Sequence, residues 1–392
     1  MQKKHALLLF LLVFIKSFYA QVNLSVYSEV SIITAGPGTE LYEAFGHSAI
    51  RIKDPVLQLD LIYNYGMFDF NAPNFYSNFT KGKLLYSLGR YKFEYFLRGY
   101  KRDKRWVKQQ VLNLNQQEKQ SFFMFLENNA LPENATYSYD PYFNNCATKL
   151  RDITTTILGD KVILSDKNIT KNRSFRQLMD KEIPWNTWGS FGINLALGSK
   201  LDQKAVFTQY MYLPDYVYTV FKNSTLFIKN QPAKLIKRED ILLDFEEQKQ
   251  SISFLNPFLI FSIVSLIGLF ISFTDFKKKK TSKWLDFILL FITGILGVLI
   301  VFLWFFTDHS TTPSNFNFLW AFAPNFVIAF LILKQQQQKW LNYYFKFSLL
   351  LLILIPILWF LEVQLFPISV IPLLILLFVR YLLLSKKLNS VI

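Results

Sequence analysis

The stretch that decides the fold is Phe143-Asn144-Asn145-Cys146-Ala147-Thr148-Lys149-Leu150-Arg151-Asp152-Ile153. Its pattern is typical of the first turns of an amphipathic helix, with Cys146 at the start. The unpaired N–H groups and the dipole at a helix N-terminus favour a thiolate over a thiol. Cys146 is also the only cysteine in 392 residues, so no intramolecular disulfide can use it. It is therefore either a buried, inert side chain or a candidate nucleophile.

A thiolate nucleophile needs a base, and histidine is the usual one near neutral pH. The sequence contains His5, His47 and His309. His5 lies in the N-terminal apolar segment and His309 in a short loop between apolar segments, which leaves His47 for the soluble part. It opens the alternating stretch 47–53, which predicts a half-buried strand, and a second strand at 59–65 completes a hairpin. A hydrogen-bonded core histidine is the alternative interpretation.

The rest of residues 21–250 predicts an α+β domain. A cysteine on a helix N-terminus and a histidine on a strand are the parts of a papain-like dyad. The other predicted elements are a strand at 30–34, a helix from a capping box at Asn115 and Glu118 to about 129, the Cys146 helix to about 158, helices between 174 and 221, and a last strand at 234–243.

Apolar segments mark both ends of the chain. Residues 1–20 resemble a signal peptide, with basic residues ahead of an apolar core. Residues 251–392 predict an all-α membrane domain of about five helices, because each apolar segment approaches the ~20 residues needed to cross a bilayer. These segments are 256–274, 284–306, 316–333, 345–361 and 366–384.

The loops between these segments predict the orientation. Lysines gather in the first loop, the third loop and the tail, whereas the second and fourth loops carry neither Lys nor Arg. Basic residues mark the cytoplasmic side, so we expect the soluble domain on the outer side of the membrane, five crossings and a cytoplasmic C-terminus. The segments hold few ionisable residues, such as Asp286 and Glu362, which disfavours a transporter and favours an anchor or a lipid-facing platform.

Composition narrows the partners. The net charge is +15, yet no zinc-finger spacing, Walker loop or dinucleotide fingerprint is present, so we predict no nucleic-acid partner. The basic excess suits solubility, topology and contact with membrane lipids. A metal site built from His47, His309 and Asp308 would have too few ligands, and we predict neither a metal nor another cofactor.

Three stretches resemble a known bacterial family. Residues 45–51, 63–70 and 137–152 are similar to the Lnb-type N-terminal periplasmic domain family, whose members carry a multi-pass C-terminal region. The loop 308–317 is similar to theirs as well. A more distant similarity is to circularly permuted NlpC-type and lecithin:retinol acyltransferase-like cysteine enzymes. In those enzymes the histidine strand precedes the cysteine helix and an Asn-Cys pair opens that helix, which implies a papain/NlpC-like fold here.

This resemblance also implies a third catalytic group, and the second histidine that those enzymes carry is missing. We expect Asn64 to orient His47, because the hairpin brings it close, with Asp60 and Glu43 as alternatives. The Cys146 backbone N–H is the expected oxyanion donor. We also predict three substrate-binding residues, Asn145, Arg51 and His309.

Two functions remain in competition. The first is a membrane-anchored thiol hydrolase or acyltransferase with a Cys146–His47 dyad. Its substrate would be an amide or ester of the cell envelope, in a peptide, peptidoglycan, a lipoprotein or a lipid. The second is a non-catalytic envelope binding or assembly protein with a degenerate papain-like domain.

Overall fold

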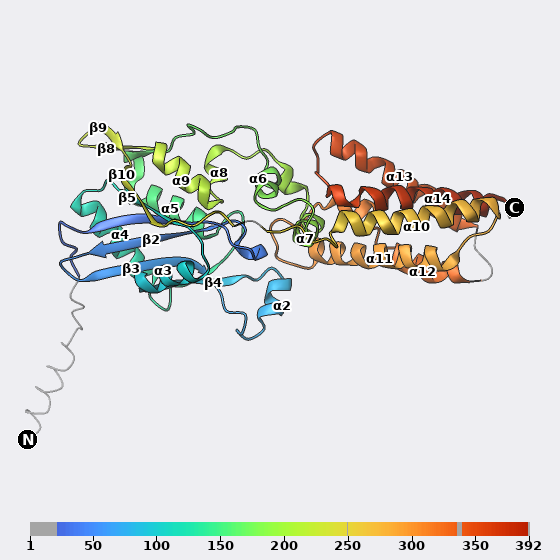
Figure 1. The fold of residues 1–392 in the computed structure, drawn as a ribbon, viewed down its shortest axis with the longest axis horizontal. Coiled ribbons are helices and arrows are strands. Elements are labelled where there is room, and N and C mark those ends of the chain that lie inside the picture. Colours follow the sequence, from blue (N-terminus) through green and yellow to red (C-terminus); the bar gives the residue numbers. More distant parts are fainter. Residues whose placement is uncertain (1–21, 249, 335–338, 391–392) are drawn as a thin grey trace, which may run out of the picture.

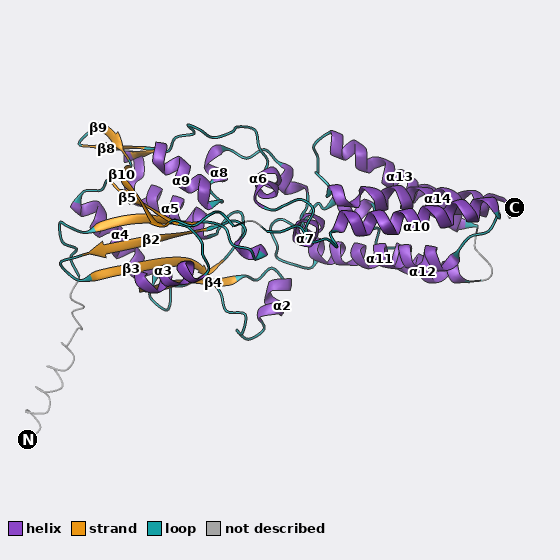
Figure 2. Ribbon diagram, in the orientation of Figure 1, coloured by secondary structure: helices purple, strands orange, loops and turns teal. Residues whose placement is uncertain are grey.

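The computed structural model describes residues 22–248, 250–334 and 339–390. The predicted signal peptide lies outside these residues. A sheet-rich domain and a helical bundle lie end to end along the long axis of the molecule (Figure 1). Strands occur in the first part and long helices fill the second (Figure 2). This confirms the prediction of an α+β domain followed by a helical membrane region.

A seven-stranded antiparallel sheet forms the first part, in the order β10-β5-β1-β2-β3-β4-β6. The predicted hairpin is β2–β3, in which Ile50 lies opposite Tyr63. The strands are β1 (Glu29–Ala35), β2 (His47–Asp54), β3 (Leu59–Met67), β4 (Leu85–Lys92), β5 (Val107–Leu112), β6 (Thr136–Ser138) and β10 (Ile236–Leu243). A small second sheet holds β7 (Val162–Ile163), β8 (Thr225–Ile228) and β9 (Gln231–Lys234).

Helices cover both faces of the large sheet, and alternate strand residues face each side. On one face, Ile50 and Tyr63 share a core with α4 (Gln116–Asn129), α5 (Cys146–Leu158) and α9 (Pro214–Asn223). On the other face, Ala49 and Ile62 pack against α3 (Phe93–Arg102). The remaining helices of this part are η1 (Leu41–Glu43), α2 (Phe75–Thr80), η2 (Gly159–Lys161), α6 (Phe175–Glu182), α7 (Trp188–Ala196), η3 (Ser199–Asp202) and α8 (Phe207–Tyr210).

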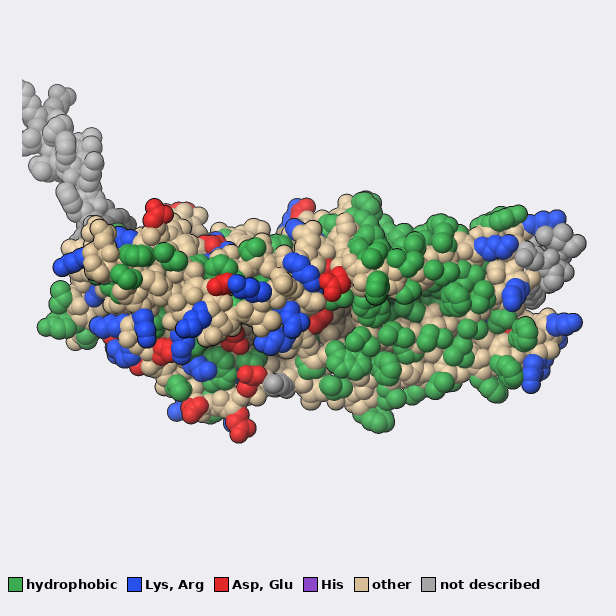
Figure 3. All heavy atoms as spheres, turned by 90° about the horizontal axis from the view of Figure 1, so that it is seen from above, with side chains coloured by type: hydrophobic (Ala, Val, Ile, Leu, Met, Phe, Trp, Pro, Cys, Tyr) green, Lys and Arg blue, Asp and Glu red, His purple; other side chains and the backbone are tan. Residues whose placement is uncertain are grey.

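Within the described part of the chain, four helices are long and apolar enough to cross a membrane: α10 (Pro257–Lys277), α11 (Lys283–Phe305), α13 (Trp340–Phe360) and α14 (Ile371–Ser390). Apolar side chains cover the middle of this bundle, and basic side chains gather at its far end (Figure 3). Four of the five apolar segments predicted from the sequence, the first, second, fourth and fifth, lie within about six residues of these helices. The largest difference at a start is in the fourth and fifth segments, where 345 becomes 340 and 366 becomes 371.

The third predicted segment, 316–333, differs. It forms a 3-10 turn, η4 (Phe316–Leu319), then a non-helical stretch, then the nine-residue helix α12 (Asn325–Leu333). At ~1.5 Å per residue α12 is about 14 Å long, roughly half of the hydrocarbon thickness. The buried Asn317 amide donates to the carbonyl oxygen of Asn194 in the soluble domain at 2.9 Å, which holds the start of this segment against that domain.

A buried charge cluster lies near the far end of the bundle, which sequence analysis missed. The Arg380 guanidinium of α14 donates to Asp286 of α11 at 2.8 Å and to Asp275 of α10 at 2.8 Å. Arg380 is 1% exposed. The expectation of a bundle almost free of charged groups is therefore wrong at this end. The cluster joins three helices, because a buried charge requires partners.

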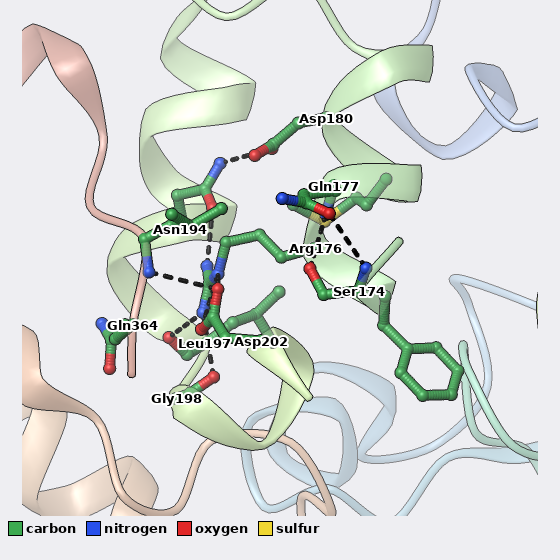
Figure 4. A network of polar contacts seen from close by, with 12 residues as sticks. Ser174, Arg176, Gln177, Asp180, Asn194, Leu197, Gly198, Asp202 and Gln364 are labelled. Carbon is green, nitrogen blue, oxygen red and sulfur yellow. Dashed lines mark hydrogen bonds and ion pairs between the residues drawn. The ribbon is translucent and has the colours of Figure 1, made fainter. Parts of the chain in front are cut away.

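The two parts meet at a polar joint (Figure 4). Arg176 of α6 is fully buried and donates through Nε to Asp202 at 2.9 Å and through Nη1 to Asn194 at 2.6 Å. The same carboxylate accepts the backbone N–H of Leu365, in the loop between α13 and α14, at 3.1 Å. This network ties the soluble domain to the bundle, and the apolar residues of α7 extend the contact into the bundle core.

Candidate active site

Cys146 is the first residue of α5, as its sequence context predicts. Asn145 caps the helix: its Oδ1 accepts the Thr148 N–H at 2.9 Å, and the Thr148 hydroxyl accepts the Asn145 N–H at 2.8 Å. Because the helix begins at Cys146, the backbone N–H of that residue has no acceptor within the helix. Cys146 is buried, with 7% of the residue exposed.

His47 is the first residue of β2, and Gly46 places it there. Gly46 adopts φ +71°, and a Cβ at this position would approach the Ala35 carbonyl oxygen to 2.7 Å. Both observations require glycine. His47 shares a sheet face with Ala49, and its ring centroid is 6.4 Å from that of Phe96 on α3. Cys146 belongs to the core of the opposite face. The imidazole and the thiol therefore come from opposite faces and meet at the end of β2.

Asn64 of β3 orients the imidazole. Its Oδ1 lies 2.5 Å from His47 Nε2, and its Nδ2 donates to the Tyr91 hydroxyl at 2.9 Å. Because an amide oxygen can only accept, His47 Nε2–H donates to Asn64 Oδ1, and Nδ1 is the nitrogen left for the thiol. Tyr91 lies on β4, and only the β3–β4 register could have identified it from sequence.

The thiol and the imidazole lie close enough for each to shift the pKa of the other. Burial disfavours the thiolate, but the positive charge and hydrogen bond of His47 and the N–H groups of Ser48 and Ala147 outweigh it, so the pKa of Cys146 is lowered. Burial likewise disfavours the imidazolium, but the thiolate charge and the hydrogen bonds to Cys146 and Asn64 outweigh it and raise the pKa of His47. Both shifts favour a thiolate–imidazolium ion pair.

Tyrosines and a second glycine line the thiol. Gly66, at φ +90°, sits at a bulge in β3, and a Cβ added there would lie 3.8 Å from Cys146 Cβ and 3.3 Å from the Tyr139 ring. Tyr139 stacks on Tyr86, with ring centroids 4.3 Å apart. Burial raises the pKa of Tyr139, so its hydroxyl stays protonated and can donate a hydrogen bond. Sequence analysis did not identify these residues as neighbours of the thiol.

Two predicted substrate-binding residues have their polar groups occupied. Both donors of the Asn145 amide are used, by the carbonyl oxygens of Pro141 and Tyr212 at 2.8 Å each. Arg51 pairs with Asp60 at 2.7 Å and stacks on Phe93, 3.8 Å from the ring centroid. Arg51 is four residues along β2 from His47, a distance of about 13 Å. These contacts give both residues structural roles, and substrate contact by either of them stays a prediction.

The alternative orienting groups also lie elsewhere. Asp60 is bound to Arg51, and Glu43 accepts a hydrogen bond from Arg105 Nη1 at 3.0 Å. Among the described residues, Asn64 is the candidate whose side chain reaches His47.

His309 lies in the loop after α11, which contacts the soluble domain. Asp308 N–H donates to the Lys81 carbonyl oxygen at 2.8 Å, and the His309 ring is 6.5 Å from that of Phe79. The next residue, Ser310, donates to Asp140, whose other oxygen accepts two backbone N–H groups of the turn before Cys146. The loop therefore supports the cysteine turn. Substrate contact by His309 stays a prediction.

Metal binding has no support among residues 22–248, 250–334 and 339–390, where no three His, Cys, Asp or Glu side chains group closely enough to hold an ion. The chemistry available here is that of a thiol, an imidazole and an amide.

These features define a class of membrane protein in which a sheet-rich domain presents a buried Cys–His–Asn constellation. Residues 15–181 match the Lnb N-terminal periplasmic domain, and residues 248–389 match the Lnb transmembrane domain. The two matches lie in the same order as the two parts of the structure. The chain belongs to the Lnb family, and its N-terminal domain is periplasmic. No curated protein and no solved structure matches it.

Proposed function

We propose that this protein is a membrane-anchored thiol hydrolase or acyltransferase that acts on an amide or ester of the cell envelope. The observation that carries the proposal is the constellation of Cys146, His47 and Asn64, in which the thiol pKa is lowered and the imidazole pKa is raised. Peptides, peptidoglycan, lipoproteins and lipids are the candidate substrates. The distant similarity to NlpC-type enzymes agrees with this chemistry.

The proposed reaction has two halves. Cys146 Sγ attacks the carbonyl carbon, and its proton resides on His47 Nδ1. The Cys146 N–H stabilises the oxyanion, and the tetrahedral intermediate collapses as His47 protonates the leaving amine or alcohol. A thioester remains. His47 then deprotonates water or a second nucleophile, which attacks the thioester and releases the thiol. Asn64 keeps the imidazole ring aligned throughout.

We further propose the cellular setting. Residues 1–20 act as a signal peptide, and the bundle lies in the inner membrane with the C-terminus in the cytoplasm. The lysines of the α10–α11 loop support this orientation, because basic loops stay inside. Single cysteines at Ser253 and Lys279, in a Cys146→Ser background, test it. An impermeant thiol reagent added to intact spheroplasts should label position 253 only, and labelling at position 279 would reverse the orientation.

The decisive experiment for catalysis uses the single cysteine. Native membranes carrying the full chain are treated with neutral hydroxylamine, which cleaves thioesters, and the Cys146 peptide is analysed by mass spectrometry. We expect an acyl adduct that hydroxylamine removes and that is absent in His47→Ala. Complementation of a deletion strain by Cys146→Ala would overturn the proposal. That outcome would favour the non-catalytic alternative, which the burial of the thiol also supports.

A further inference from the structure

An arm of residues 68–83 leaves the sheet between β3 and β4 and carries an aromatic cluster. Phe68, Phe70 and Phe75 form its centre, with Phe68–Phe70 centroids 4.8 Å apart and Phe70–Phe75 centroids 5.2 Å apart. Phe75 also contacts Tyr76 and Phe79, at 5.4 and 6.2 Å. The short helix α2 thus displays aromatic side chains on several sides.

Much of this cluster faces outward. Tyr76 is 70% exposed, Phe79 49% and Phe70 48%. Contiguous exposed apolar side chains on a soluble domain mark an interaction site, because water solvates them poorly. Lys81 and Lys83 stand exposed beside the aromatic side chains. This combination of aromatic and basic residues is typical of segments that lie in the headgroup region of a bilayer.

The position of the arm identifies the partner. The Lys81 carbonyl oxygen accepts the Asp308 N–H. Gly82 lies so close to His309 that a Cβ at position 82 would come within 2.5 Å of the His309 backbone nitrogen. That loop follows α11 directly, so the arm is fixed to the outer end of a membrane helix. Figure 1 shows α2 at the end of the domain that faces the bundle and displaced to the side of the bundle. If the bundle spans the membrane, lipid lies beside it on that side.

We propose that the arm inserts its aromatic side chains into the headgroup region of the outer leaflet beside the bundle. It is a second membrane contact, separate from the membrane-spanning helices. Phe68 contacts Tyr86 at 5.0 Å, and Tyr86 stacks on Tyr139 next to the thiol. The arm therefore fixes the height of the cysteine site above the bilayer, whether or not the site is catalytic.

Site-directed spin labelling of the full chain tests this surface. Tyr76→Cys and Tyr27→Cys are made in the Cys146→Ser background, labelled with a nitroxide, and placed singly in phosphatidylethanolamine–phosphatidylglycerol nanodiscs. The two tyrosines are equally exposed, at 70%. Tyr27 lies just before β1, at the end of the sheet away from His47, because Glu29 pairs with Lys53 and Ala35 with His47.

We expect the label at position 76 to collide severalfold less with a water-soluble nickel chelate, and more with oxygen, than the label at position 27. Equal nickel accessibility at both positions would overturn the proposal. Protection that appears only when two copies share a nanodisc would also overturn it, and would assign the surface to a second copy. Neither readout depends on the reactivity of Cys146, which is replaced in both variants, so the result is independent of the proposed function.

Discussion

Two opposing effects act on the Cys146 thiol. Burial raises the free energy of the thiolate, whereas the neighbouring imidazolium and two backbone N–H groups lower it. The second effect dominates only while His47 is present and charged. The reactivity of this thiol is therefore a property of the pair rather than of the cysteine alone.

The pH dependence of alkylation tests the pair. A lowered thiol pKa leaves thiolate present below the ordinary range, so reaction with iodoacetamide should persist at neutral pH and fall only as the pH drops through the lowered pKa. In His47→Ala burial dominates and the thiol pKa rises. We expect its alkylation rate at pH 7 to fall by about tenfold or more, since each pKa unit is a factor of ten. Equal pH profiles would show that His47 does not activate the thiol.

Tyr91 offers a test of the orienting group. Tyr91→Phe removes the acceptor of the Asn64 amide while leaving the aromatic ring in place. The loss of one hydrogen bond of about 1 kcal/mol should slow alkylation at neutral pH by about fivefold and shift the thiol pKa upward. Tyr95→Phe, on an exposed tyrosine of α3, is the control and should leave the profile unchanged.

The residues of the site differ in how far the sequence could predict them. Cys146 and His47 were identifiable because the sequence has one cysteine and one histidine in its soluble part. Asn64 followed from the hairpin. Arg51 and Asn145 are predicted to bind substrate because polar side chains near a nucleophile suggest binding. Two of their partners, Gln109 on β5 and the carbonyl group of Tyr212, come from distant segments that a single sequence does not reveal.

At the scale of the element, α5 depends on its first residues. The Asn145 side chain closes a capping box and also holds two buried carbonyl groups of other segments. The side chain therefore joins the helix start to the turn before it and to the loop at Tyr212.

Asn145→Ala should destabilise the domain by about 2–3 kcal/mol, because it removes a helix cap and leaves two buried carbonyl groups unsatisfied. Asn115→Ala is the matched control, since Asn115 forms the same capping box on α4 at an exposed position. That change should cost about 1 kcal/mol. Urea unfolding followed by fluorescence measures both. Equal losses would mean that the extra carbonyl contacts of Asn145 contribute nothing.

The helix α12 shows the limit of hydropathy at this scale. Residues 316–333 are apolar enough to suggest a span, yet Asn317 and Asn325 within them are buried and hydrogen-bonded. Their partners are Asn194 in the periplasmic domain and Thr293 in α11. The start of the segment is held against the folded domain, and only residues 325–333 continue as an α-helix. Hydropathy alone does not predict these contacts with residues far away in the sequence.

At the scale of the whole molecule, the polar contacts between the domain and the bundle hold the two parts in a fixed relative position. Asp202 is bound by buried Arg176 on one side and by the Leu365 N–H of the bundle on the other. A second pair, Lys204 with Glu362, crosses the same boundary on the surface at 2.7 Å. The two pairs differ mainly in burial, at 0% and 2% exposure against 49% and 58%.

Burial should decide what each pair contributes. Asp202→Ala leaves a buried guanidinium unpaired, and we expect a loss of about 3–5 kcal/mol together with faster proteolysis of the connector at residues 244–256. Lys204→Ala should change stability by less than about 1 kcal/mol. Thermal unfolding and trypsin digestion in nanodiscs measure both variants. Similar behaviour of the two variants would contradict a structural role for the buried network.

The Arg380 cluster has a consequence for biogenesis. The ribosome delivers α10 and α11 first, and with them Asp275 and Asp286, long before the last helix that carries their guanidinium partner. The early helices therefore hold two carboxylates at the lipid boundary until α14 arrives. A chain that stops ahead of α14 should be cleared by membrane proteases, whereas one that stops after Lys386 should persist, so completion of the last helix serves as a checkpoint on synthesis.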